Sequence, residues 1–179
     1  MKVSELMSKH PLNPDFAGVT TNDDWVLAVK TSPDQATEKD YIVIQSGVTS
    51  HAASINSESA DSQYVRTGKN TIRTSAQRQF SVTGDRMIAD PAQEYLLSRK
   101  IAFGTGEAVV VDYVYFNIFT GKGEKGKLSV DVTEDAGGDA GSNTTFAIDM
   151  KSTAVPEEYT YTEELQESSA VATSEGASA

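Results

Sequence analysis

Almost every regular stretch of this chain has the pattern of a β-strand, and this feature constrains the fold most. Alternating or continuous apolar runs occupy residues 25–30, 41–45, 71–83, 108–120, 128–132 and 146–150. The second run is expected to continue past Gly47 as far as Ile55. Because no helices alternate with these runs, the sheet is expected to be mostly antiparallel. Six or seven strands and one helix predict a mostly β protein, an antiparallel β-sandwich or barrel-like domain with one flanking α-helix.

The helix signal begins at Asp90. Its carboxylate can accept hydrogen bonds from the free N–H groups of a first turn, Pro91 suits the first helical position, and Gln93 completes a capping box. The apolar residues that follow share one side of a helix, namely Leu96, Leu97 and Ile101. The pattern therefore predicts a single helix from about Pro91 to Ala102, ended by a glycine.

Polar and glycine-rich stretches between the strands are expected to be loops. The longest spans 56–70, and two shorter ones span 121–127 and 136–143. The first glycine-rich stretch fits the dinucleotide pattern G-x-G-x-x-G, but a strand follows where that motif requires a helix, so the tip of a hairpin is favoured. The acidic residues around the second lack the ligand spacing of a calcium loop and favour a solvated turn.

Composition changes at both ends of the chain. Residues 1–24 hold two prolines and are expected to form an N-terminal arm that is mostly loop, and residues 25–161 are expected to form the β domain. Residues 162–179 are expected to be an acidic, disordered C-terminal tail, because they have few large apolar side chains. The start lacks the apolar stretch of a signal peptide, which favours a protein made in the cytoplasm.

Charge and the scarcity of reactive side chains exclude several functional classes. The chain has 15 basic and 26 acidic residues and a net charge of −11, which argues against a protein that binds nucleic acid over a broad surface. With 0 cysteines and 2 histidines, thiolate and His-rich metal sites are excluded. Neither His10 nor His51 belongs to a recognisable nucleophile motif. We therefore expect no enzyme activity, no metal and no cofactor, and no apolar run is long enough to span a membrane.

The strand around 109–119 is apolar on both faces. One interpretation is a strand buried between the sheet and the predicted helix. The other is a strand whose second face packs on a neighbouring subunit, a role that tyrosine suits because it is amphipathic. The second interpretation makes Tyr113 and Tyr115 candidates for inter-subunit contacts.

Basic residues dominate the stretch from 66 to 86. Arg66, Lys69, Arg73, Arg78 and Arg86 occur there with Asp85 as the single acid. Internal ion pairs or a solvated face are the commoner reasons for such a stretch. The alternative is a head-to-tail contact with an acidic surface of an identical copy, and contacts of that kind build rings or filaments.

Two segments resemble the major tail tube proteins of long-tailed, non-contractile (siphovirus-type) bacteriophages. Residues 77–86 read Gln-Arg-Gln-Phe-Ser-Val-Thr-Gly-Asp-Arg, and residues 90–96 read Asp-Pro-Ala-Gln-Glu-Tyr-Leu. In that family a strand that ends in Gly-Asp-Arg is followed by an Asp-Pro-Ala-Gln helix. The resemblance covers roughly residues 25–161.

The resemblance implies a structural virion protein that self-assembles. Such proteins form six-membered rings that stack into the phage tail tube, the conduit for DNA ejection, and DNA passes through the lumen without specific binding. The implied partners are further copies of the chain, a tape measure protein and tail terminator or distal tail proteins, with no membrane. The implied location is the virion tail, after assembly in the host cytoplasm. A long loop between early strands, here 56–70, and the terminal arms bridge neighbouring rings in that family.

These features together give the candidate inter-subunit contacts. They are Val3, Leu6 and Phe16 in the N-terminal arm, Tyr64, Arg66, Lys69 and Arg73 in the loop and the basic stretch, and Tyr113 and Tyr115 in the long apolar strand. Two rival functions stay open: a subunit of a phage-like injection apparatus, and a monomeric ligand-binding β-sandwich module. A ligand-binding module of this kind needs an exposed aromatic platform, and the chain has 1 tryptophan, Trp25.

Overall fold

An antiparallel sheet of 8 strands forms the body of the protein, which confirms the expected mostly β class. The computed structural model describes residues 1–162, so all but the first residue of the predicted acidic tail lies outside the described residues. The strands are β1 (Trp25–Val29), β2 (Ile42–Val43), β3 (Val48–Tyr64), β4 (Gly68–Asp85), β5 (Val110–Asn117), β6 (Lys122–Gly137), β7 (Thr145–Ser152) and β8 (Glu157–Thr160). The helices are α1 (Val3–Met7), α2 (Pro91–Leu96) and α3 (Arg99–Ala102), with 3₁₀ turns η1 (Asn22–Asp24), η2 (Glu38–Asp40) and η3 (Gly106–Val109).

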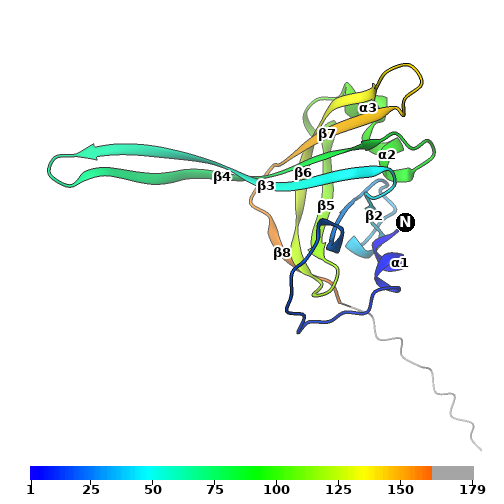
Figure 1. The fold of residues 1–179 in the computed structure, drawn as a ribbon, viewed down its shortest axis with the longest axis horizontal. Helices are drawn as coiled ribbons and strands as arrows, with labels where there is room; N and C mark the ends of the chain where they lie inside the picture. The colour runs from blue at the N-terminus through cyan, green and yellow to red at the C-terminus, as the bar shows by residue number, and fades with distance from the viewer. Residues whose placement is uncertain (163–179) are drawn as a thin grey trace, which may run out of the picture.

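The long strand β6 joins two layers of one continuous sheet. The strand order is β2-β1-β5-β6-β7-β4-β3, and β8 also pairs with β6. Residues 123–129 of β6 pair with β5, whereas residues 128–137 pair with β7. The two halves therefore face each other (Figure 1), and Phe80 of β4 meets Tyr113 and Tyr115 of β5 with ring centroids 5.4 and 5.0 Å apart.

Two apolar cores lie on opposite faces of β1 and β5. The main core lies between the layers, and α2 and α3 close it with Ala92, Leu96, Leu97 and Ile101. The second core lies on the outer face, where α1 and the segment around β8 cover it with Val3, Met7 and Tyr161. Each face of β5 is thus buried in a different core, which explains why the sequence around 109–119 is apolar on both faces.

The predicted helix is two short helices. Asp90 caps the first one as expected, since its Oδ1 accepts hydrogen bonds from the backbone N–H groups of Ala92 and Gln93 at 3.1 and 3.0 Å. The expectation of one continuous helix was wrong because the backbone is extended at Ser98, with ψ 149°. This break redirects the chain while Leu97 before it and Ile101 after it both stay in the core.

Gln93 does not complete a capping box. Its side chain is buried and joins three backbone groups outside the helix. Its Oε1 accepts from the N–H of Met87 at 2.7 Å, and its Nε2 donates to the carbonyl oxygens of Ser46 and Asp85 at 2.6 and 3.2 Å. Gln93 therefore ties α2 to the ends of the neighbouring strands.

Two predicted loops belong to strands. Residues 56–70 are mostly paired strand of β3 and β4, and residues 122–127 are the first part of β6. Gly123 does not form a turn but lets β6 approach β5 closely, because a Cβ at this position would lie 2.0 Å from the carbonyl oxygen of Tyr115. The short α1 was also missed, in a stretch expected to be mostly loop, and β8 was missed within the predicted β domain.

Candidate assembly surfaces

The most prominent surface feature is a two-stranded ribbon that projects from the body (Figure 1). It consists of residues 55–77, the outer parts of β3 and β4, and is called the hairpin arm below. Because β4 pairs with β7 only from Gln79 to Asp85, the strands of the arm pair only with each other. Its large apolar side chains are exposed: Ile55 at 58%, Tyr64 at 51%, Val65 at 89% and Ile72 at 55%. The described chain covers none of them.

The arm carries three basic side chains, Arg66, Lys69 and Arg73, and two acidic ones, Glu58 and Asp61. Lys69 pairs with Asp61 on the facing strand at 2.7 Å, in an exposed ion pair. Arg73 donates from its Nε to the carbonyl oxygen of Ser75 at 3.3 Å. Within residues 1–162, neither Arg66 nor Arg73 forms an ion pair. Both guanidinium groups are therefore available to an acidic surface.

The root of the arm is held by a shielded ion pair. The Nε and Nη2 atoms of Arg78 donate to the two carboxylate oxygens of Glu124 at 2.5 and 2.8 Å, and the hydroxyl of Tyr113 donates to the same carboxylate at 3.2 Å. The Glu124 carboxylate raises the pKa of Arg78. The guanidinium also lies over the rings of Phe80 and Tyr115, at 5.6 and 5.8 Å from their centroids. These contacts fix the position at which the arm leaves the body.

One broad face of the sheet points away from the main core. This open face is formed by the outward side chains of β4, β7 and the second half of β6, which are Gln79, Ser81, Thr83, Ala147, Asp149, Lys151, Ser129, Asp131 and Thr133. Most of these side chains are small and polar. Asp131 lies directly opposite Asp149 in the strand register, an arrangement of like charges that costs stability. The open face is thus polar and weakly acidic.

The far end of β4 carries a second apolar patch. The loop after β4 exposes Met87 at 46% and Ile88 at 79%. Together with residues of the turn between β6 and β7, they line a pocket of about 520 Å³, which we call the far-end pocket. Its lining residues are Asp85, Arg86, Met87, Ile88, Asp135, Ala136, Asn143 and Thr144. Arg86 is already paired with Glu94 at 2.9 Å, so the unpaired charge at this pocket is acidic.

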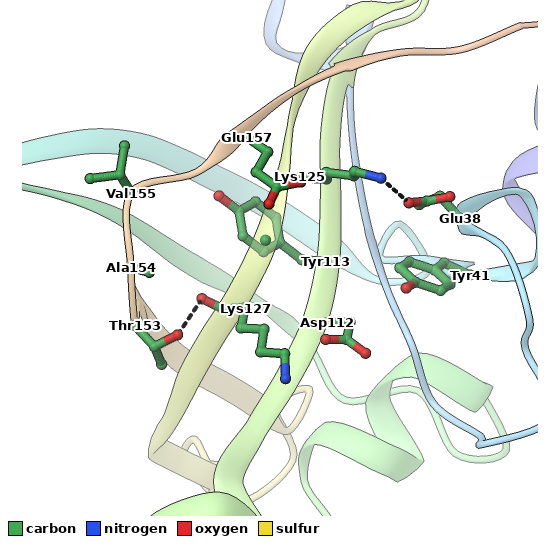
Figure 2. A pocket seen from close by; sticks show the side chains of 11 residues that line it. Glu38, Tyr41, Asp112, Tyr113, Lys125, Lys127, Thr153, Ala154, Val155 and Glu157 are labelled. Atoms are coloured by element: carbon green, nitrogen blue, oxygen red, sulfur yellow. Dashed lines mark hydrogen bonds and ion pairs between the residues drawn. The ribbon is translucent and has the colours of Figure 1, made fainter.

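A pocket of about 410 Å³ lies on the other side of the body, between η2, β5 and β6 (Figure 2). The Nζ of Lys125 reaches Glu38 at 2.7 Å and lowers the pKa of that carboxyl. Burial, with smaller contributions from Asp112 and Glu38, raises the pKa of Tyr41 to about 12. Glu38 and Lys125 are therefore engaged with each other, and the tyrosine is not poised as a base. The ion pair attaches η2 to the sheet.

Metal-binding clusters and membrane-spanning helices are two further features that would indicate a function. In residues 1–162, no three His, Cys, Asp or Glu side chains come together so that they could hold a metal ion. Within that range, none of the helices has the length and apolar character needed to cross a membrane. His51 lies beside Tyr115, with ring centroids 6.3 Å apart, and burial lowers its pKa.

The structure divides the predicted contact residues into exposed and buried ones. Tyr64, Arg66, Lys69 and Arg73 come together on the hairpin arm and are exposed. Leu6 packs partly against the second core, and Phe16 stacks on Phe119 with ring centroids 4.5 Å apart. The far-end pocket was not anticipated, because Met87 and Ile88 are two apolar residues in a polar stretch and form no periodic pattern.

Three predicted contact residues are buried within the chain itself. Val3 is 0% exposed in the second core, and Tyr113 and Tyr115 are 1% and 7% exposed in the main core. Phe80 of β4 packs on both tyrosine rings, and Val3 of α1 packs into the second core. The structure therefore replaces the inter-subunit interpretation of these three side chains with the core interpretation.

Comparison with known proteins finds chains of similar structure but no family or curated protein of similar sequence. No family model and no curated protein matches the sequence. A chain in the virion of a native gene transfer agent particle is similar with a TM-score of 0.56 and 16% identity, over 78% of this chain and 98% of that one. A chain in the tail of an empty gene transfer agent particle, refined with C6 symmetry, is similar with a TM-score of 0.56 and 17% identity, over 80% of this chain and 100% of that one. The resemblance carried by residues 77–96 is thereby confirmed as one of fold: this chain has the fold of a phage-like tail protein.

Proposed function

We propose that this protein is the structural subunit of a tail tube, in which six copies form a ring and rings stack into a conduit for DNA. The hairpin arm carries the proposal. It is a long paired ribbon with exposed apolar side chains, and its strands find no partner in the described chain except each other. A two-stranded hairpin alone is marginally stable in water, so such an arm favours a protein that seats it against another copy. The likeness to a tail with C6 symmetry supports rings of six.

The exposed edge of the sheet supports self-association. β3 ends the strand order, so the edge of residues 48–54 that faces away from β4 has no partner in the described chain. An exposed edge strand is a template for pairing with another chain. Pairing around a closed ring removes every such edge while keeping the contact specific.

The open face suits the wall of a DNA conduit. Small polar side chains give a smooth surface, and Asp131 and Asp149 outnumber the single basic residue of that face, Lys151. Affinity for DNA comes mostly from basic groups that neutralise phosphates and release counterions. A face of this composition therefore lets DNA pass without holding it.

The same proposal assigns roles to the segments outside the sheet. We take residues 25–161 as the tube domain, although α1 in the N-terminal arm completes its second core. Residues 8–24 and the acidic tail 162–179 are proposed as contacts between rings, with Phe16 the best placed of the predicted residues. The function also requires a tape measure protein and tail terminator or distal tail proteins as partners.

Electron microscopy of the purified protein tests the proposal. Negative-stain images and mass photometry should be recorded over a range of protein concentrations and salt. Rings or tubes with a central channel are expected, with a mass that is a multiple of six subunits. A protein that stays monomeric under every condition would overturn the proposal and favour the rival ligand-binding module.

A further inference from the structure

Two surfaces without a partner lie at opposite ends of the same strand. β4 starts at Gly68, directly after the turn at the tip of the hairpin arm, and ends at Asp85, directly before the far-end pocket. The tip of the arm presents Val65, the most exposed of its apolar side chains, next to Arg66. The far-end pocket presents exposed apolar side chains next to carboxylates. These two surfaces belong to different ends of a long, straight element, so one chain cannot bring them together.

The two surfaces are complementary in polarity. At the arm tip, Val65 is 89% exposed, and Arg66 forms no ion pair in residues 1–162. At the pocket, Met87 and Ile88 provide the apolar floor. The end of β6 and the turn after it form its other wall. Residues 134–144 contain three acids and no basic residue, and of these acids, Glu134, Asp135 and Asp139, Asp135 lines the pocket. The arm tip, which is apolar and positively charged, is therefore complementary to the far-end pocket, which is apolar and negatively charged.

Both surfaces also hold the backbone in an uncommon conformation. Among the described residues, only Arg66 and Ala89 have a positive φ without being glycine, at 72° and 67°. Such conformations persist where the surrounding structure requires them, and they cluster at active sites, ligand clamps and switch regions. One of them lies in the arm tip and the other lies in the loop that carries Met87 and Ile88.

We infer that the tip of the hairpin arm of one copy docks in the far-end pocket of a copy in the next ring. Val65 packs against Met87 and Ile88, and Arg66 lies beside Asp135. A shift of one copy along the direction of β4 brings these surfaces together, and because the contact joins two different patches it repeats without end. The inference rests on the proposed function, since it names the surface that receives the arm. It also gives a role to the acidic, glycine-rich turn between β6 and β7.

Thiol cross-linking tests the contact directly, because the chain has 0 cysteines. Val65→Cys and Ile88→Cys would be introduced together, and the assembled protein treated with a short bis-maleimide, which does not need the strict geometry of a disulfide. A ladder of covalent multimers is expected on a denaturing gel. A mixture of the two single variants should give cross-linked dimers and no longer products.

A matched control uses an equally exposed side chain on another part of the molecule. Val155 is 85% exposed and lies away from the far-end pocket, so Val65→Cys combined with Val155→Cys should not give the ladder. Tubes that form normally but show no ladder with the Val65–Ile88 pair would overturn the docking and leave the proposed function intact. A protein that never assembles would overturn both.

A charge exchange provides a second readout that does not depend on cysteine. Arg66→Glu is expected to raise the protein concentration needed for assembly by about two- to fivefold, the usual size of an exposed charge contact. Adding Asp135→Arg should restore assembly, since it recreates an opposite pair. If Asp135→Arg alone weakens assembly and the double variant is weaker still, Arg66 and Asp135 are not neighbours and the docking is wrong.

Discussion

At the scale of single residues, Arg78 is the side chain whose environment differs most from what the sequence suggests. It interrupts the apolar face of a strand, yet its guanidinium is only 19% exposed and is matched by Glu124. Removing one partner of a shielded, bidentate pair leaves a charge without compensation. Arg78→Met is therefore expected to lower the free energy of unfolding by about 2 kcal/mol.

Urea unfolding of the variant measures this loss. Lys69→Met is the matched control, because it removes the exposed pair with Asp61 and is expected to cost less than about 0.5 kcal/mol. Equal losses for the two variants would contradict a stabilising role for the root of the arm.

Glu38 gives the body a dependence on pH. Lys125 lowers the pKa of Glu38 below its ordinary value of 4.5, so at acidic pH the unfolded chain binds more protons than the folded one. The stabilisation from this pair is complete above the unfolded pKa and is lost as the pH falls through the lower folded pKa. The Glu38→Gln protein is expected to lose less stability than the wild type between about pH 5 and about pH 3.

Urea midpoints across that range test the expectation. Glu107→Gln serves as the control, since Glu107 is exposed and forms no ion pair among the described residues. A Glu38→Gln variant with the same slope as the wild type would show that the contact with Lys125 does not form in solution.

At the scale of elements, prediction from sequence succeeds where side chains alternate against a core. β1, β5 and β7 have such alternation or continuous apolar runs, and their predicted positions are close to the observed ones. The outer part of the hairpin arm, residues 56–70, has no core to face, so it carries no apolar period and was expected to be a loop. The start of β6 was missed for another reason, because glycine signals turns more often than close packing.

Some residues of the assembly surfaces could likewise be predicted from the sequence, and others could not. Basic composition singled out Arg66, Lys69 and Arg73, all of which lie on the arm. Tyr113 and Tyr115 were ambiguous because a strand between two cores has the same pattern as a strand at an interface. The far-end pocket depends on two segments that are far apart in the sequence, and no local pattern could bring them together.

The cap of α2 gives a prediction at this scale. Asp90 accepts two backbone hydrogen bonds, and their loss leaves the first turn without a cap. Asp90→Ala is expected to cost about 1 kcal/mol, whereas Asp90→Ser should retain most of the stability because serine also caps. Thermal unfolding of both variants measures the difference, and equal losses would mean that the carboxylate acts in some other way.

The arm itself can be removed as a unit. Replacing residues 56–77 with Asn-Gly would place a two-residue turn between Ile55 and Arg78, which are paired in the register. The body is expected to keep its unfolding midpoint, because the deleted residues add no side chain to either core. Stacking into tubes should be lost. Tubes of normal length from this variant, seen by negative stain, would show that the arm does not join rings.

At the scale of the whole molecule, the net charge of −11 says little about the conduit, because it includes the acidic tail. The local composition of the open face decides how DNA is received. Tubes with Asp131→Lys and Asp149→Lys are expected to retain DNA, with an affinity that falls steeply as salt increases. Wild-type tubes should not retain it.

Cosedimentation of a fluorescent oligonucleotide with assembled tubes measures this retention. Asp15→Lys with Glu107→Lys makes the same change of charge away from the open face and is the control. Equal retention by both double variants would show that the open face does not line the channel.

The pairing of β1 with β5 has a consequence for how the chain is synthesised. Val29 pairs with Tyr113, so β1 leaves the ribosome long before its partner, and at about 5–20 residues per second the wait lasts about 4 to 17 seconds. The two strands of the arm follow each other directly and need no later residue to pair, and hairpins form within microseconds. The strands of the arm can therefore pair on the nascent chain before the body is complete. Translation speed and chaperone access, rather than the final contacts, then decide how many chains complete β1 before they meet a second copy.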